Sequence, residues 1–162
     1  MNRVALLIGG NQGDRRQLIE QATVLIQQRI GAVVASSRLY ETAPWGNFGD
    51  DRPQDFLNQA LLVETPLEAH TVLKEALEIE KDLGRSRSPR CSSVSRIYHS
   101  RPMDIDLIFF NEEIIDTPDL TIPHPRMHLR RFVLEPLAEI MPDYLHPAMG
   151  KTVKELLDQI PE

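Results

Sequence analysis

One short segment, residues 101–110, constrains the fold more than any other part of the chain. Pro102 prevents a helix from running through its start, and the apolar run after it is too short for a typical helix. These features predict a buried strand. Alternate strand residues face the same way, so Asp104 and Asp106 should project together, about 7 Å apart at the backbone. We expect their face to continue with Ile108 and Phe110, and the opposite face to carry Met103, Ile105, Leu107 and Phe109.

Two carboxylates at the start of a buried strand repel each other unless a positive charge lies between them. Mg²⁺ meets this requirement, because it binds one or two carboxylates and completes its coordination with water and substrate phosphate. A solvated strand end would also accommodate Asp104 and Asp106. The bare Asp-x-Asp pattern is too short to decide between these interpretations.

The segment before this strand, residues 84–102, contains five arginines and no acidic residue. The whole chain has 18 basic and 24 acidic residues and a net charge of −6, so the cationic segment is a local feature. Arginine matches phosphate geometry. A solvated basic loop is the alternative, but its position beside the paired aspartates favours phosphate binding. The net negative charge argues against a general nucleic-acid binder.

The order of expected elements indicates an α+β domain with a largely antiparallel sheet, spanning residues 1–162 as one unit. Further strands are expected at Val4–Ile8, Val33–Tyr40 and Phe56–Val63, and a hairpin turn at 111–113 leading into a strand at 114–116. Helices are expected after Asp14 up to Gly31, after a Thr65/Glu68 capping box up to Leu83, at 136–140, and after a Thr152/Glu155 capping box.

The sequence also indicates the cellular compartment. The single cysteine, Cys91, excludes a disulfide framework, and neither a signal peptide nor a run of transmembrane length is present. We therefore expect a cytoplasmic protein without a membrane partner. The sequence does not decide whether the chain is a monomer.

Several polar or aromatic residues stand where a ligand could use them. Phe56 and Asn58 share a strand face, which suits a flat heterocycle but also ordinary core packing. Glu80 interrupts the apolar helix stripe of Leu73, Ala76, Leu77 and Leu83, so it either meets a buried base or lines a pocket. His124 lies between two prolines, which restrict its backbone.

Five motifs in this order resemble the 6-hydroxymethyl-7,8-dihydropterin pyrophosphokinase family of folate biosynthesis. They are Tyr40-Glu41-Thr42-Ala43-Pro44-x-Gly46, Asp55-Phe56-Leu57-Asn58, Leu83-Gly84-Arg85, Arg101-x-x-Asp104-Ile105-Asp106 and Pro123-His124-Pro125-Arg126-Met127. The resemblance covers the chain from Val4 to about Pro147. It implies a ferredoxin-like α+β fold with helices on both sides of the sheet. It also implies transfer of pyrophosphate from MgATP to the pterin hydroxymethyl group, with release of AMP.

The resemblance assigns a role to each matching position. Asp104 and Asp106 would bind two Mg²⁺ ions, and Arg85 and Arg101 would act with them in catalysis. The pterin would contact Thr42, Ala43, Trp45, Phe56, Asn58 and Phe132. The co-substrate ATP would contact Glu80, Arg87, Leu107, Thr121, His124 and Arg130. Tyr98-His99-Ser100 departs from the usual aromatic-Gly-Pro before the arginine.

Two other functions fit part of the pattern. A nucleotidyl transferase with a palm-like aspartate pair would release pyrophosphate from ATP instead of AMP. A ferredoxin-like RNA-binding module would use the arginines as its contact, but the negative net charge and the absence of an aromatic RNA-binding strand argue against it.

Overall fold

A central antiparallel sheet forms the framework of the protein, as a computed structural model shows for residues 1–11, 13–42, 55–84 and 103–160. The strand order is β2-β4-β1-β5, and β3 pairs with β4 beyond the end of β2. The strands are β1 (Asn2–Gly10), β2 (Ala32–Ser36), β3 (Tyr40–Thr42), β4 (Phe56–Thr65) and β5 (Asp104–Phe110). The predicted α+β class with a largely antiparallel sheet is therefore confirmed.

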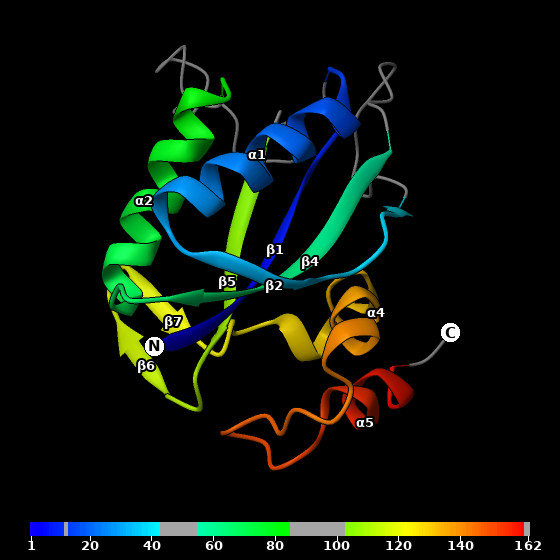
Figure 1. Ribbon diagram of the computed structural model, residues 1–162. Helices are drawn as coiled ribbons and strands as arrows, with labels where there is room; N and C mark the ends of the chain where they lie inside the picture. The colour runs from blue at the N-terminus through cyan, green and yellow to red at the C-terminus, as the bar shows by residue number, and fades with distance from the viewer. Residues whose placement is uncertain (12, 43–54, 85–102, 161–162) are drawn as a thin grey trace.

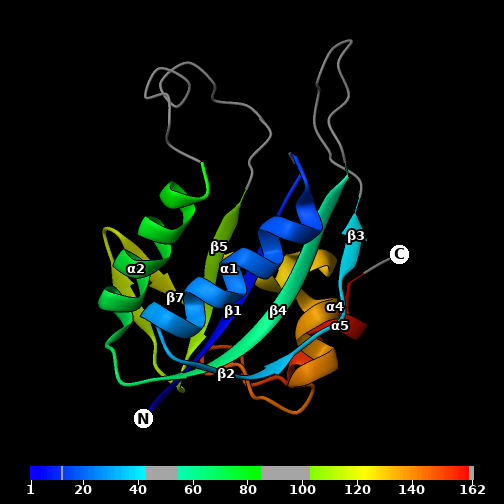
Figure 2. The same ribbon diagram turned by 45° about the horizontal axis from the view of Figure 1, so that its top comes forward.

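Helices cover both faces of this sheet (Figure 1). Figure 2 shows α1 (Arg15–Arg29) and α2 (Ala69–Asp82) on one side, and α4 (Arg131–Ile140) and α5 (Val153–Asp158) on the other. Apolar side chains fill both spaces, around Leu6, Ile26 and Ile79 on the first face and around Leu7, Leu134 and Leu156 on the second. No helix in these described ranges is both long and apolar enough to cross a membrane.

The helix starts follow local hydrogen bonding. Asp14 caps α1 by accepting from the backbone N–H of Gln17, and Thr152 and Glu155 form the predicted capping box of α5. The predicted capping box at Thr65 is wrong. Thr65 is the last residue of β4, and its hydroxyl donates to the Ile30 carbonyl, so α2 begins later, at Ala69.

Other predicted elements are divided or paired differently. The single strand expected over Val33–Tyr40 is two strands, β2 and β3, separated at Ser37, whose hydroxyl accepts from the Ala60 N–H. In α2 the buried face is shifted, because Leu77 is 49% exposed whereas Val72 and Ile79 are fully buried.

The turn expected at 111–113 is present, with the Glu113 N–H donating to the Phe110 carbonyl, but it does not close a hairpin with β5. The strand that follows it, β6 (Ile115–Thr117), pairs with β7 (Leu120–Ile122) in a separate two-stranded sheet. Along β5, the Ile108 carbonyl instead accepts from the backbone N–H of His124. After β7 the chain forms a short 3-10 helix, η1 (Met127–Leu129), and then enters α4.

A register shift in β5 changes which face its last residues occupy. Phe109 lies opposite Ala5, whereas Leu107 lies opposite Leu6, so Ile108 is the extra residue of a bulge. Phe109 consequently joins the core under α4, and Phe110 joins the core under α1 and α2. The sequence-based assignment of these two phenylalanines was therefore reversed.

Candidate active site

Three neighbouring strands bring predicted site residues into one row at one end of the sheet. Gly9 of β1 lies opposite Asn58 of β4 on one side and opposite Asp104 of β5 on the other. Residues directly opposite in antiparallel strands project from the same face. Ala5 and Leu7, four and two positions before Gly9, pack in the core under α4. Asn58 and Asp104 therefore flank Gly9 on the α4 side of the sheet.

Gly9 has a specific steric reason to be glycine. A Cβ atom there would lie 2.3 Å from the carbonyl oxygen of Leu57 and 2.4 Å from Oδ1 of Asn58. Both distances are far below van der Waals contact, so any larger residue would displace the Asn58 amide. The sequence analysis missed this position, because the close approach depends on strand register.

Asp104 and Asp106 project from the same face, as their spacing predicted. Asp104 lies opposite Gly9 and Asp106 opposite Leu7, and both side chains are partly buried. The described residues contain no cluster of three or more His, Cys, Asp or Glu side chains that could enclose a metal. A carboxylate pair nevertheless fits Mg²⁺, which takes its remaining ligands from water and nucleotide phosphates.

Glu80 of α2 supports the strand that carries these aspartates. Its side chain is 2% exposed, and Oε2 accepts a hydrogen bond from the Ile105 backbone N–H at 2.6 Å. A buried carboxyl oxygen that accepts a backbone N–H satisfies a donor that would be costly to leave without a partner. The glutamate that interrupts the apolar stripe thus holds the peptide between Asp104 and Asp106.

Three of the predicted pterin contacts, Thr42, Phe56 and Asn58, meet where β3 pairs with β4. Thr42 lies opposite Phe56, and the Asn58 amide Nδ2 donates to Thr42 Oγ1 at 3.3 Å. Asn58 is 8% exposed and Phe56 is partly buried. The structure therefore brings together an aromatic ring, an amide and a hydroxyl within one corner of the sheet.

Phe132 reaches the same side of the sheet from the first turn of α4. Its ring is partly buried against the core under α4, and the Arg130 guanidinium carbon lies 5.5 Å from the ring centroid. Because α4 packs against β3 and β4, Phe132 and Arg130 lie on the face that carries Phe56 and Asn58.

His124 lies within electrostatic reach of both Asp104 and Arg130. Burial lowers the pKa of His124 below its ordinary 6.5, the positive charges of Arg130 and Arg126 lower it further, and Asp104 acts in the opposite direction. The imidazole is consequently neutral near pH 7. Its backbone N–H donates to the Ile108 carbonyl at 3.0 Å, which attaches the residue to β5.

The remaining predicted residues are more dispersed. Thr121 is exposed on β7, and the Leu107 side chain packs in the core under α1 and α2. The predictions for Ala43, Trp45, Arg85, Arg87 and Arg101 lie outside the residues that the structure describes.

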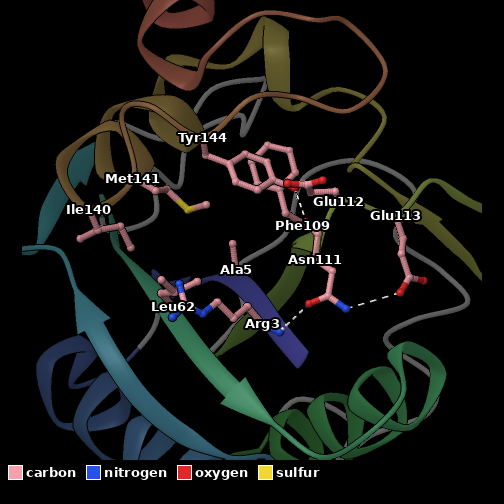
Figure 3. Close-up of a pocket in the computed structure, with 10 residues that line it drawn as sticks. All are labelled: Arg3, Ala5, Leu62, Phe109, Asn111, Glu112, Glu113, Ile140, Met141 and Tyr144. Carbon is pink, nitrogen blue, oxygen red and sulfur yellow. Dashed lines mark hydrogen bonds between the residues drawn. The ribbon is translucent and has the colours of Figure 1, made fainter. Parts of the chain in front are cut away.

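A separate cavity of about 710 Å³ opens at the other end of the sheet. Figure 3 shows Arg3, Asn111 and Glu113 at its edge, joined by hydrogen bonds, and the rings of Phe109 and Tyr144 side by side within it. Arg3 lies near the start of β1 and Asn111 directly after β5, whereas the row around Gly9 lies at the opposite strand ends. Of the predicted site residues that the structure describes, none lines this cavity.

The fold and the row of site residues define an α+β domain with a carboxylate pair and an aromatic–amide corner on one sheet face. The model of the 7,8-dihydro-6-hydroxymethylpterin-pyrophosphokinase family matches residues 5–142. The chain therefore belongs to this family.

Curated relatives agree over most of the chain. A protein from Porphyromonas gingivalis, named 2-amino-4-hydroxy-6-hydroxymethyldihydropteridine pyrophosphokinase, is 37% identical over 145 residues, covering 89% of this chain and 93% of that protein. A Bacillus subtilis protein of the same name is 41% identical over 142 residues, covering 86% of this chain and 79% of that protein.

Solved structures agree in fold. A crystal structure titled as HPPK-DHPS in complex with substrates superposes with a TM-score of 0.74 at 17% identity, over 97% of this chain and 43% of that one. The chain thus spans less than half the length of that solved protein.

Proposed function

We propose that this protein transfers pyrophosphate from ATP to the hydroxymethyl group of 6-hydroxymethyl-7,8-dihydropterin and releases AMP, as a step of folate biosynthesis. The observation that carries the proposal is the row Asn58–Gly9–Asp104, in a chain whose family is defined by this reaction. Asn58 belongs to the aromatic–amide corner, and Asp104 belongs to the carboxylate pair.

The spacing within this row suits the reaction. Neighbouring strands lie roughly 4.8 Å apart, so the backbones of Asn58 and Asp104, two strands apart, are separated by about 10 Å. A pterin whose edge bonds to Asn58 can therefore present its hydroxymethyl group toward phosphates held at Asp104. Gly9 contributes no side chain between them, and its missing Cβ lets the Asn58 amide lie against the β1 backbone.

For the pterin, we propose that Phe56 and Phe132 stack on the two faces of the ring, and that Asn58 binds its polar edge. Offset stacking between rings adds about 0.5–1.5 kcal/mol to the free energy of area burial. Thr42, Ala43 and Trp45 complete the proposed pterin site.

For the nucleotide, we propose that Asp104 and Asp106 bind two Mg²⁺ ions together with the ATP phosphates. Mg²⁺ would neutralise phosphate charge and polarise the group that is transferred. The proposed ATP contacts are Glu80, Arg87, Leu107, Thr121, His124 and Arg130.

Phosphoryl transfer depends more on positioning and charge neutralisation than on covalent catalysis. Glu80 fixes the backbone at Ile105 and thus the direction of both aspartate side chains. Arg85 and Arg101 are proposed to neutralise the negative charge that develops on the phosphates. The proposal includes no general base.

The products of ATP separate this proposal from its rivals. Incubation with ATP, Mg²⁺ and the reduced pterin should give AMP and a pterin diphosphate. A nucleotidyl transferase would give free pyrophosphate, and an RNA-binding module would leave ATP intact; either result would overturn the proposal.

A further inference from the structure

Arg15, the first residue of α1, bonds to two segments that are distant from it in sequence. Its Nη1 atom lies 2.9 Å from Oε2 of Glu41 and donates to the backbone carbonyl of Asp55 at 2.7 Å. The Arg15 side chain is only 24% exposed. One guanidinium nitrogen thus ties the end of β3 to the residue before β4.

These two segments carry proposed pterin contacts. Glu41 directly precedes Thr42, and Asp55 directly precedes Phe56, which lies opposite Thr42 in the β3–β4 pairing. Thr42 in turn accepts the hydrogen bond of the Asn58 amide. A displacement of either segment would therefore change the distance between the aromatic ring and the hydrogen-bonding groups.

The short length of β3 makes this attachment consequential. β3 has three residues, and in the described part of the chain it pairs with β4 alone. A strand of this length makes few backbone hydrogen bonds, so its position depends on side-chain attachments. At the other end of β3, Tyr40 donates to Glu139 of α4 at 2.8 Å. Within the described residues, a side-chain bond therefore holds β3 on each side of its middle: Tyr40 to α4, and Glu41, which precedes Thr42, to Arg15 of α1.

We propose that Arg15 is a positioning residue for the pterin: it holds Thr42 and Phe56 at the separation that the bound ring requires. The inference rests on the proposed function for the identity of the ligand. Arg15 does not itself touch the substrate in this account. It acts through the Glu41 carboxylate and the Asp55 carbonyl.

The test compares Arg15→Ala, Arg15→Lys, Glu41→Ala and a control, Arg29→Ala. Arg29 lies at the other end of the same helix and makes an ion pair of similar length with Asp82, at 2.7 Å compared with 2.9 Å for Arg15 and Glu41. The pterin is titrated calorimetrically into protein saturated with a non-hydrolysable MgATP analogue, and the analogue is titrated separately. Steady-state kcat and KM and thermal melts are measured beside them.

Arg15→Ala should raise the pterin Kd and KM about tenfold, because loss of hydrogen bonds to a charged group is worth about one decade of affinity. The Kd of the MgATP analogue and kcat should change less than about twofold. Glu41→Ala should have a smaller effect, since the bond to the Asp55 carbonyl survives. Arg15→Lys should recover part of the pterin affinity, and Arg29→Ala should change the Kd of neither ligand.

An Arg15→Ala protein that binds the pterin like wild type would overturn the inference, and so would equal weakening of both ligands. If Arg15→Ala fails to fold, the same titrations are read on Glu41→Ala and Arg15→Lys. Wild-type pterin affinity in both variants, or equal weakening of both ligands, would then overturn the inference. Wild-type protein that neither binds the pterin nor forms AMP would instead overturn the proposed function, and this inference with it.

Discussion

The buried carboxylate of Glu80 accepts a hydrogen bond from the Ile105 backbone N–H at 2.6 Å, at the peptide between Asp104 and Asp106. The bond joins α2, on one face of the sheet, to the strand whose aspartates project from the other face. It thus couples the packing of α2 to the direction of the two carboxylates.

Replacing Glu80 with Leu should therefore affect both stability and nucleotide binding. The Ile105 N–H would lose its acceptor, which costs about 1–3 kcal/mol of unfolding free energy. The affinity for a MgATP analogue should fall as well, because the aspartates lose their support and the nucleotide loses a proposed contact. Glu80→Gln keeps an acceptor oxygen and should lose less of both.

Denaturant unfolding and calorimetric titration of the analogue measure these effects. Glu78→Gln, at an exposed position on the same helix, is the matched control and should behave like wild type. A Glu80→Leu protein with wild-type stability and nucleotide affinity would show that the bond to Ile105 is dispensable.

Gly9→Ala should weaken pterin binding as well as the fold, because the added Cβ would overlap the Leu57 carbonyl and the Asn58 amide. Gly31→Ala is a strict control: its Cβ would lie 2.0 Å from the Glu64 carbonyl, at the other end of β4. Both variants should melt below wild type, but only Gly9→Ala should lose pterin affinity in the protein that remains folded. Equal pterin affinity in the two variants would remove Gly9 from the site.

Asp106→Asn should separate stability from activity. The two aspartates repel each other without metal, so the uncharged variant should melt at or slightly above the wild-type temperature in the absence of Mg²⁺. The stabilisation that MgATP gives to wild type should largely vanish, and AMP formation should fall by orders of magnitude. Asp116 is an exposed residue of β6, and Asp116→Asn should leave the melting temperature, the stabilisation by MgATP and the rate of AMP formation unchanged. A metal-free Asp106→Asn protein that melts well below wild type would make Asp106 chiefly structural.

His146 predicts a pH dependence of stability. Its Nδ1 accepts from the backbone N–H groups of Ala148 and Met149 at 3.1 and 3.0 Å. Burial lowers the pKa of His146 below its ordinary 6.5, and nearby His128 lowers it further. Because the folded-state pKa is the lower one, this contribution to stability is present above pH 6.5 and is lost as the pH falls through the folded-state pKa.

Thermal melts between pH 8 and pH 5 test this prediction against His146→Asn, whose side-chain oxygen can accept the same two bonds without titrating. The variant should lose less stability than wild type on acidification. Parallel losses in the two proteins would mean that other groups govern the acid response.

Local geometry at the candidate site could be predicted from the sequence. The two-residue period of a strand placed Asp104 and Asp106 on one face, and Glu80 stood out because a charged residue interrupted an apolar helix stripe. Both signals lie within a single element, where spacing alone determines direction.

What could not be predicted depends on pairing between distant segments. The bulge at Ile108 exchanged the faces of Phe109 and Phe110, and it arises from the register of β5 against β1. The close approach of Gly9 to Asn58 likewise exists only once β1 and β4 are aligned. Thr65 matched a capping pattern, but its hydroxyl found the Ile30 carbonyl, a partner that sequence spacing does not reveal.

The most direct test of the central claim follows the β-phosphate of ATP. With ATP labelled at the β position, Mg²⁺ and 6-hydroxymethyl-7,8-dihydropterin, the label should leave the nucleotide and appear on the pterin, in an amount equal to the AMP formed. Label that stays on the nucleotide as ADP, or that appears as free pyrophosphate with an unmodified pterin, would contradict it.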